Sequence, residues 1–380
     1  MRIAVDAHAV GRKLTGNETY IRNIVRELAA LGDRHEYHAY VSAPGAENVI
    51  PSQFAVRRVS NNPFRRLGFD FPTDLRRLRP DVLHVQYTAP LACPVPVVVS
   101  IHDISYLDHP EFFPTTRAWQ LRVTVARTVR KAARILTLSE YSRDAILRAY
   151  RVPQDRVEVI PLGVDPCFCA MDHDTARRWV TQRYAIAAPY VLTVGDLQPR
   201  KNQVGLVNAF AGLMRERPEL PHHLVFAGKE NWHGQQVREA ARRSGFAGRI
   251  HFTGFVDDAD LRRLYCGCDV FAFPSFYEGF GLPVVEAMAC GRAVACSDAT
   301  SLPEVADSAA LLFDPNSRER MAKALRDLLI DPELRARMER LGLQNAARFS
   351  WREAARRTRD AYEAAAGAAR KEPARAAVRS

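Results

Sequence analysis

Apolar and polar residues alternate along this chain in two periods, one typical of strands and one typical of helices. Short runs rich in β-branched residues are separated by longer segments in which apolar residues recur at helical spacing. Between Glu18 and Leu31, one helix face carries Ile21, Ile24, Val25 and Leu28. Strands that alternate with helices in this way are typical of parallel sheets covered by helices on both faces. The pattern therefore predicts an α/β fold of the doubly wound type.

The predicted strands form two groups along the chain. The first group is Arg2–Asp6, His35–Val41, Val82–Gln86, Val97–His102, Ile135–Leu138 and Val157–Ile160. The second group is Tyr190–Val194, His223–Ala227, Ile250–Thr253, Val270–Phe273 and Ala293–Cys296. Helices are expected around the second group at Asn202–Arg215, Gln235–Arg243, Asp257–Cys266, Pro283–Ala289 and Ser317–Arg348. Each group suffices for one sheet, so two Rossmann-like domains are expected.

The pattern pauses after Gly163 and restarts at Tyr190, and 380 residues is long for a single core. Ser350 is a suitable N-cap for a further helix. The last segment is rich in Ala and Arg and has few apolar anchors. The expected organisation is a first domain over 1–165, a second domain over 166–349, a helix over 350–366 and a disordered tail over 367–380.

Composition places the chain among soluble globular proteins, because 47% of its residues are hydrophobic and 26% are charged. The longest apolar run, Leu91–Ile101, contains two prolines and is shorter than the roughly 20 residues needed to cross a bilayer. The first ten residues contain Asp6 and lack a signal-peptide pattern, so a cytoplasmic location is expected. The seven cysteines are scattered and lack zinc-site spacing, which indicates reduced thiols and no metal site.

The formal net charge of +11 favours an acidic partner, such as nucleic acid, an anionic membrane or a phosphorylated ligand. No helix-turn-helix, zinc-finger or RNA-recognition pattern is present, so nucleic acid is not expected. Basic residues gather in the first domain at Arg65, Arg66, Arg76, Arg77, Arg79, Arg117, Arg122, Arg127, Arg130, Lys131 and Arg134. Two interpretations of this set stay open: a solvated arginine-rich face, or contact with anionic lipid headgroups.

The segment from Phe273 to Gly291 carries the most particular chemical pattern of the chain. It consists of a strand, a loop with two glycines, and a helix whose first turn contains Pro283. Backbone amides at the start of this helix are expected to face oxygen atoms of a ligand, and they belong to Phe280, Gly281 and Leu282. Gly279 and Gly281 would let the backbone approach that ligand closely.

Two carboxylates flank the same loop, Glu278 before it and Glu286 in the helix. They can accept hydrogen bonds from hydroxyls of a sugar or ribose, although a favourable interaction with the helix dipole is the alternative. This segment resembles the E-x7-E signature of retaining GT-B glycosyltransferases of family 4. The resemblance covers nearly the whole chain. It implies two Rossmann-like domains facing each other across a cleft, with a C-terminal helix that returns to the first domain.

Arg200 and Lys201 follow a strand that ends beside Gly195, and they resemble the family segment that holds the donor diphosphate. Adjacent cations at the carboxyl edge of a parallel sheet suit that role. Val256 lies in a segment that resembles the family loop beside the nucleobase. An ordinary turn capped by Asp257 is the alternative there.

The first domain contributes two further candidates. Gly16 takes the place of the family's glycine-rich loop after the first strand, but Asn17 and Glu18 stand where small residues are commoner. His102 ends a strand at a position where the family places a histidine beside the transferring sugar. A structural histidine is the alternative interpretation.

The resemblance implies transfer of a hexose from a nucleoside diphosphate sugar with retention at the anomeric carbon. GDP-mannose is the first candidate donor and UDP-hexoses are alternatives; the expected acceptor is a saccharide or lipid-linked saccharide of a cell-surface polysaccharide, met at the inner face of the membrane. The implied catalytic residues are His102, Glu278, Arg200 and Lys201. The implied donor-binding residues are Gly16, Gly195, Arg200, Lys201, Val256, Glu278, Gly279, Phe280, Gly281, Leu282 and Glu286.

No metal or other cofactor is expected, because the two cations and the helix N-termini would stabilise charge on the leaving diphosphate. The alternative is a different GT-B activity, such as a nucleotide-sugar hydrolase or a sugar phosphorylase. A nicotinamide dehydrogenase is not favoured, since no G-x-G-x-x-G pattern follows a strand with an acidic residue about twenty positions later.

Overall fold

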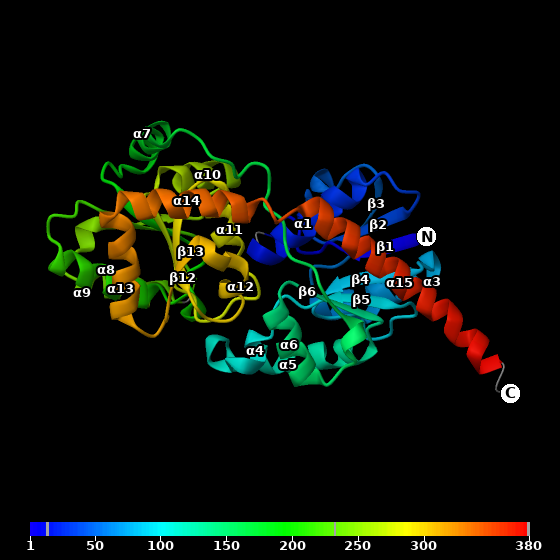
Figure 1. Ribbon diagram of the computed structural model, residues 1–380. Helices are drawn as coiled ribbons and strands as arrows, with labels where there is room; N and C mark the ends of the chain where they lie inside the picture. Colours follow the sequence, from blue (N-terminus) through cyan, green and yellow to red (C-terminus); the bar gives the residue numbers. More distant parts are fainter. Residues whose placement is uncertain (13–14, 232, 378–380) are drawn as a thin grey trace. The chain divides into compact units, whose positions relative to one another are not determined.

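A computed structural model describes residues 1–12, 15–231 and 233–377 (Figure 1). The chain divides into two compact units. The first unit combines Met1–Gly163 with Ser350–Ser380, and the second unit is Val164–Phe349. The C-terminal helix thus belongs to the first unit, as the sequence predicts.

The first unit is built on a seven-stranded parallel sheet with the order β3-β2-β1-β4-β5-β6-β7. Its strands are β1 (Arg2–Asp6), β2 (Glu36–Val41), β3 (Phe54–Arg58), β4 (Val82–Gln86), β5 (Val97–Ser100), β6 (Arg134–Thr137) and β7 (Val157–Val159). Its longer helices are α1 (Thr15–Ala30), α3 (Phe71–Leu78), α5 (Thr115–Lys131), α6 (Glu140–Tyr150) and α15 (Trp351–Ala377). Short turns of helix include α2 (Pro63–Arg65), η2 (Arg66–Asp70) and α4 (Ser105–Asp108). The central strands are buried throughout, as expected for a parallel sheet covered on both faces.

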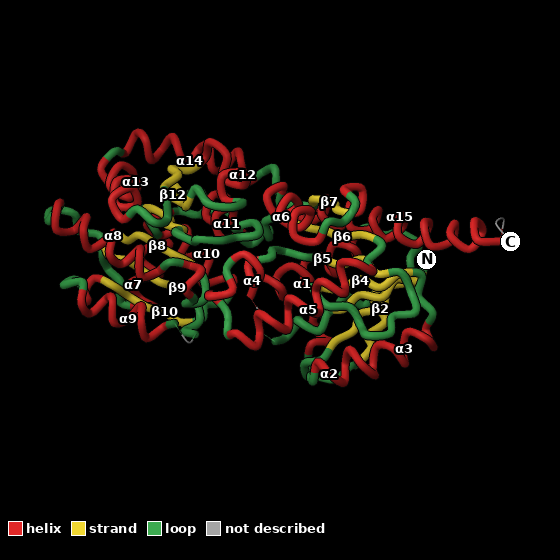
Figure 2. The backbone as a smooth tube through the Cα atoms, turned by 90° about the horizontal axis from the view of Figure 1, so that it is seen from below, coloured by secondary structure: helices red, strands yellow, loops and turns green. Residues whose placement is uncertain are grey.

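The second unit repeats this plan with a six-stranded parallel sheet of order β10-β9-β8-β11-β12-β13 (Figure 2). Its strands are β8 (Tyr190–Val194), β9 (His223–Ala227), β10 (Ile250–Gly254), β11 (Val270–Phe273), β12 (Ala293–Ser297) and β13 (Ala310–Phe313). Its helices are α7 (His173–Tyr184), α8 (Gln203–Glu216), α9 (Gly234–Arg243), α10 (Asp258–Gly267), α11 (Leu282–Ala289), α12 (Leu302–Ala306), α13 (Arg318–Ile330) and α14 (Pro332–Ala346). Apolar clusters fill both faces of this sheet.

Every predicted strand is present, but the sequence analysis missed β3 and β13. Both lie at the edge of their sheet, where a strand needs apolar residues on fewer positions. The predicted helix Ser317–Arg348 is wrong in one respect, because it is two helices that meet at Asp331. The Asp331 side chain accepts hydrogen bonds from the amides of Glu333 and Leu334, and Pro332 begins α14.

Helix α15 continues to Ala377 in the structure, and disorder over 367–380 stays a prediction. Ala and Arg have high helix propensity, and a chain already in a helix extends it at little cost. The last three residues lie outside the described part of the chain.

Helix α15 packs on α1 and on the central strands of the first sheet. Its start lies against Gly163, where an added Cβ would stand 2.0 Å from the backbone nitrogen of Trp351. Farther along, the Tyr362 hydroxyl lies 2.6 Å from Nδ1 of the buried His84. The His84 Nε2 lies 2.8 Å from the Ser100 hydroxyl, which in turn lies 2.8 Å from the Tyr20 hydroxyl. A buried chain of polar contacts therefore joins α15 to β4, β5 and α1.

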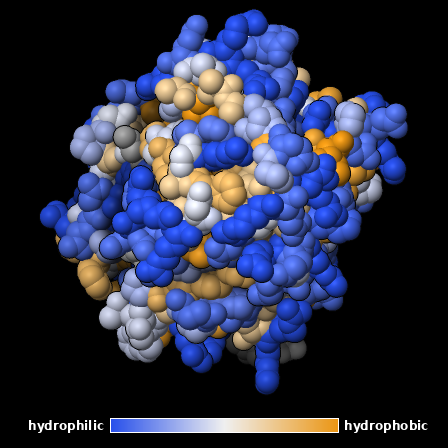
Figure 3. Space-filling model, turned by 90° about the vertical axis from the view of Figure 1, so that its left-hand side faces the viewer, coloured by the Kyte–Doolittle hydropathy of each residue, from blue (hydrophilic) through white to orange (hydrophobic). Residues whose placement is uncertain are grey.

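Among the described residues, no helix combines the length and the apolar character that crossing a membrane requires. The face that Figure 3 shows carries mostly hydrophilic residues, with hydrophobic ones between them.

Candidate functional site

Glycines end neighbouring strands at the carboxyl edge of the second sheet. Gly195 follows β8 with φ of 142°, and its amide donates to the carbonyl oxygen of Ala227 on β9. Gly228 follows β9, and an added Cβ there would stand 2.2 Å from the Gly195 carbonyl oxygen. Side chains are thus excluded where the two loops meet. This edge is where open parallel sheets bind ligands.

Glu278 lies buried between two cations that follow the same strand edge. Its Oε2 accepts a hydrogen bond of 2.9 Å from Nη1 of Arg200, and its Oε1 accepts one of 2.7 Å from Nζ of Lys201. Burial raises the pKa of Glu278, but the charges of Arg200 and Lys201 outweigh burial and lower that pKa to about 2. The three side chains form a cluster with one positive charge in excess, which suits an anionic ligand.

Lys201 is almost as buried as its partner, with 13% of its side chain exposed. Burial lowers the pKa of Lys201, and the Glu278 carboxylate opposes that effect. The Nζ of Lys201 also lies 4.8 Å from the centre of the Phe273 ring, and this cation–π contact stabilises its charge. The Lys201 side chain runs past Gly195, where an added Cβ would stand 3.4 Å from its Cε.

The loop that carries Glu278 is fixed to its neighbours on both sides. The Glu278 amide donates to the Thr300 hydroxyl at 3.0 Å, and the Ser301 hydroxyl donates to the Glu278 carbonyl oxygen at 2.9 Å. The Arg200 guanidinium also donates to the carbonyl oxygen of Tyr277 at 2.7 Å. Thr300 adopts φ of 57°, a conformation that costs a non-glycine residue free energy and is concentrated at functional sites. The position of Glu278 is therefore determined by its backbone as well as by its ion pairs.

Helix α11 begins directly after this loop. Gly281 precedes the helix with φ of 100°, and an added Cβ would stand 2.5 Å from Cδ2 of Leu302. Pro283 lies in the first turn, as predicted. The Phe280 ring is buried edge-on against Phe349 at 5.4 Å, so Phe280 can offer a ligand only its backbone.

Glu286 lies within α11 and is buried, and its Oε2 accepts a hydrogen bond of 2.9 Å from the hydroxyl of Tyr265. The structure thus gives the two glutamates different partners, cations for Glu278 and a phenol for Glu286. Val256 is half-buried after β10, and Asp257 caps α10 through the amide of Asp260 at 2.9 Å. The capping interpretation of that segment is therefore correct, and a role of Val256 in binding the base stays a prediction.

The first unit places His102 just after β5, with 7% of the residue exposed. Its ring lies 4.6 Å from that of Tyr20 and 5.6 Å from that of Tyr87. Burial lowers the pKa of His102 to about 4, against the opposing charge of Asp103. In the described part of the chain, the buried Nε2 of His102 has no hydrogen-bond partner. A neutral imidazole with an unused nitrogen can bind a hydroxyl.

Gly16 lies in the first turn of α1 and is exposed, and a Cβ there would meet no atom within 4 Å. Packing therefore does not explain the glycine, and its part in binding stays a prediction. The preceding Leu14 lies outside the described residues. Glu18 accepts a hydrogen bond of 2.8 Å from the amide of Gly11, which closes the loop after β1.

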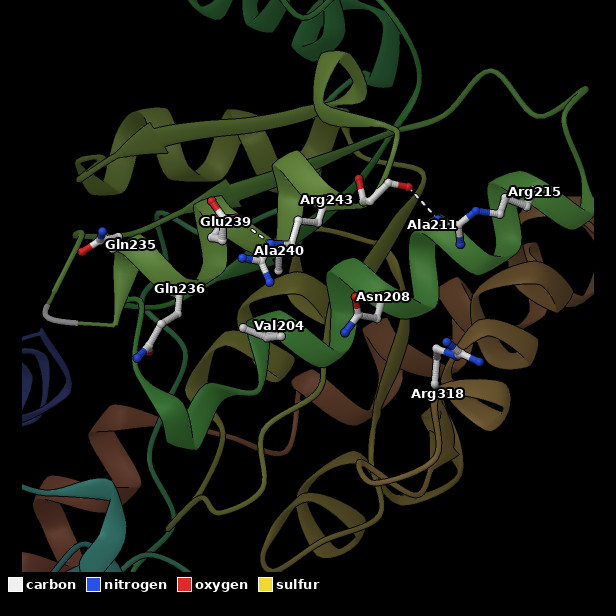
Figure 4. A pocket seen from close by; sticks show the side chains of 11 residues that line it. Val204, Asn208, Ala211, Arg215, Gln235, Gln236, Glu239, Ala240, Arg243 and Arg318 are labelled. Atoms are coloured by element: carbon white, nitrogen blue, oxygen red, sulfur yellow. Dashed lines mark hydrogen bonds and ion pairs between the residues drawn. The ribbon is translucent and has the colours of Figure 1, made fainter.

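Sequence reasoning missed the residues that hold the site together, namely Tyr265, Thr300 and Ser301. Nothing in their local sequence distinguishes a supporting hydroxyl from a solvated one, because each acts on a residue distant along the chain. A separate groove of about 610 Å³ lies between α8 and α9 (Figure 4). Its arginines are already engaged, Arg215 with the carbonyl oxygen of Ser244 and Arg243 with Glu239. None of the predicted site residues lines that groove.

Comparisons with known proteins match both units. The family model described as "Glycosyltransferase Family 4" matches residues 14–167, and the model described as "Glycosyl transferases group 1" matches residues 184–344. The chain is 35% identical over 271 residues to O-antigen chain mannosyltransferase B of Escherichia coli, a match that covers 70% of each chain.

Solved structures share the fold over nearly the whole length. Sucrose-phosphate synthase from Thermosynechococcus elongatus is 19% identical with a TM-score of 0.79, and the match covers 96% of this chain and 98% of that one. HepE of Anabaena, solved in complex with UDP and glucose, is 21% identical with a TM-score of 0.76. That match covers 95% of this chain and 98% of HepE.

Proposed function

The chain belongs to glycosyltransferase family 4, has the GT-B fold and is a hexosyltransferase; on that premise we propose that it transfers mannose from GDP-mannose to a saccharide or lipid-linked saccharide. The proposed donor sugar follows from the 35% identity to a mannosyltransferase that extends an O-antigen chain. The acceptor would then be a growing cell-surface polysaccharide.

One observation carries the proposed donor site: two cations share a single buried carboxylate. In the cluster of Arg200, Lys201 and Glu278, the carboxylate compensates one of the two buried positive charges. A diphosphate could take hydrogen bonds from both cations without desolvating them again. Glu278 would at the same time hold the two side chains in fixed positions beside the donor.

We propose that this cluster does the electrostatic work of the reaction. Negative charge grows on the diphosphate as the glycosidic bond breaks, and preorganised cations stabilise that charge without rearrangement. The transfer would then be retaining and independent of metal, with the acceptor hydroxyl attacking on the face that the diphosphate leaves. A phosphate oxygen of the leaving group would accept the proton of that hydroxyl. No protein nucleophile is required.

The remaining predicted residues have supporting roles in this proposal. Glu286 would bind hydroxyls of the ribose or sugar, and Gly279, Gly281 and Leu282 would offer backbone groups to the donor. His102, neutral and with a free Nε2, would bind a hydroxyl of the transferring sugar.

A test is thermal stabilisation by GDP-, UDP-, dTDP- and ADP-sugars in EDTA, followed by product analysis with an oligosaccharide acceptor. The expected result is selective stabilisation by GDP-mannose and acceptor-dependent release of GDP. Glu286→Ala should lose the stabilisation, and Glu239→Ala, in the groove between α8 and α9, should keep it. Release of GDP that is equally fast without an acceptor would replace the transferase assignment with a hydrolase. Dependence on a divalent ion would contradict the proposed role of Arg200 and Lys201.

We further propose that the enzyme works in the cytoplasm at the inner face of the membrane. A lipid-linked acceptor resides there, and the basic residues of the first unit would favour anionic headgroups.

A further inference from the structure

Five of the seven large apolar side chains that are exposed in the described part of the first unit lie on elements that hydrogen bonds join to one another. They lie on α2 and η2, on the loop between β4 and β5, and on α5: Phe64 (81% exposed), Phe69 (64%), Leu91 (65%), Trp119 (68%) and Val123 (49%). We call these five residues the apolar anchors. A soluble protein rarely leaves so many large apolar side chains in water on adjoining elements, and such patches mark binding surfaces.

The elements that carry the apolar anchors are joined to one another. The amide of Leu91 donates to the carbonyl oxygen of Leu67 in η2 at 3.1 Å. On its other side the same loop is bound to α5, because the Arg127 guanidinium donates to the carbonyl oxygens of Pro90 and Leu91 at 3.2 and 3.1 Å. The loop thus bridges η2 and α5. The five apolar anchors therefore lie on elements that contact one another.

Helix α5 presents its apolar anchors as a stripe. Trp119 and Val123 are one turn apart, and Arg127, which holds the Leu91 loop, follows Val123 by one more turn. The opposite side of α5 is buried, with Ala118, Val125 and Val129 in the core. Trp119 and Val123 therefore form a second apolar stripe on α5, opposite the buried one.

The anchors are surrounded by positive charge. The exposed cations of α5 are Arg117, Arg122, Arg130 and Lys131, and the sequence of α5 contains no acidic residue. Arg65 follows Phe64 at the end of α2. Its side chain is 71% exposed and makes a long contact of 3.4 Å with Asp70. The partner must therefore tolerate apolar insertion and carry negative charge.

We propose that the apolar anchors and the cations of α5 form a docking surface for an anionic phospholipid bilayer. Trp at the headgroup level, aliphatic and Phe side chains slightly deeper, and arginines against lipid phosphates match the composition of that interface. A second copy of this chain fits less well, because self-association would bring the same cations of α5 together. The inference rests on the proposed membrane location, and it is independent of the donor sugar.

The test is co-sedimentation of the full chain with vesicles of phosphatidylglycerol and phosphatidylcholine in equal parts, compared with vesicles of phosphatidylcholine alone. The expected result is binding to the anionic vesicles that weakens steeply with salt. Trp119→Ser with Val123→Ser should weaken that binding by about tenfold or more, as should Arg122→Gln with Arg130→Gln. Tryptophan emission should shift to shorter wavelength on binding in the wild type and not in the variant that lacks Trp119.

The matched control is Ile330→Ser with Leu343→Ser, which removes two comparably exposed apolar side chains from the second unit. It should leave vesicle binding unchanged. Equal weakening by both pairs, or equal binding to neutral vesicles, would overturn the proposal. A change of oligomeric state in vesicle-free buffer on replacing Trp119 and Val123 would assign the surface to a second copy instead. Thermal stabilisation by GDP-mannose without vesicles should be the same in all these variants, which separates failure of this surface from failure of the donor site.

Discussion

The Nζ of Lys201 and the Oε1 of Glu278 lie 2.7 Å apart in a pair whose two side chains are 13% and 8% exposed. The other carboxylate oxygen accepts from Arg200 at 2.9 Å. Because both oxygens are engaged and water is largely excluded, the charge of each partner depends on the others. If the donor binds here as proposed, function and stability depend on the same three side chains.

Replacing Lys201 with Met should lower the free energy of unfolding by about 3 kcal/mol, since it leaves a buried carboxylate with one cation fewer. Urea unfolding would measure the loss. Lys323→Met is the control, because Lys323 pairs with Asp327 at the surface and should cost about 0.5 kcal/mol or less. The double variant Lys201→Met with Glu278→Gln should regain part of the stability without regaining transferase activity. Equal costs for the two lysine variants would contradict the coupling.

Acid should destabilise the protein through Glu278. Its pKa is about 2 in the folded chain against an ordinary value of 4.5, so the ionised form is favoured by folding. The resulting contribution is complete above about pH 4.5 and is lost as the pH falls toward 2, with a total of about 3 kcal/mol. The difference in unfolding free energy between wild type and Glu278→Gln should shrink over that interval. A difference that stays constant from about pH 6 to pH 3 would refute this account.

Gly281→Ala should disrupt the start of α11. The new Cβ would meet Leu302 at 2.5 Å, and the φ of 100° is unfavourable for any side chain. Gly245→Ala is the control for the cost of the positive φ alone, because Gly245 has φ of 81° and open space around it. We expect Gly281→Ala to cost at least about 1 kcal/mol more than Gly245→Ala and to weaken stabilisation by GDP-mannose. Indistinguishable melting and donor binding in the two variants would rule out the steric role of Gly281.

His102 should stay neutral through the range in which an ordinary histidine titrates, because burial lowers its pKa to about 4. Folding then disfavours the protonated form, so stability should rise with pH between about 4 and 6.5. His102→Asn should remove that part of the pH dependence. The same substitution should lower kcat by about tenfold or more if His102 binds the transferring sugar. Unchanged kcat would leave His102 a structural role.

The sequence predicted the central strands well because their residues are buried on both faces and form continuous apolar runs. Edge strands are buried on one side only, and β3, with Ala55 and Val56 exposed and two arginines after them, has no such run. The break at Asp331 was readable from Pro332, but a continuous helical period masked it. The local pattern of apolar residues thus predicts strands that are buried on both faces, but it does not predict edge strands.

The candidate site shows a different limit. Its motif residues could be found from the sequence, since cations after a strand and glycines before a helix have a physical meaning at those positions. Their partners could not, because Glu278 meets Lys201 from 77 positions away along the chain. Sequence reasoning gave Arg200, Lys201 and Glu278 separate ligands to hold. The structure shows that Arg200 and Lys201 both form ion pairs with Glu278.

The placement of α15 has a consequence for synthesis of the protein. The ends of the second unit meet, since the Val164 amide donates to the carbonyl oxygen of Phe349 at 3.3 Å, and Gly163 lies against Trp351. The second unit is therefore an insertion within the first. During translation the ribosome must complete all of that insertion before α15 can cover Tyr20 and His84. Until then the surface around Tyr20 and His84 would stay exposed to water. Chaperone binding to the nascent chain should therefore be strongest before the last helix emerges.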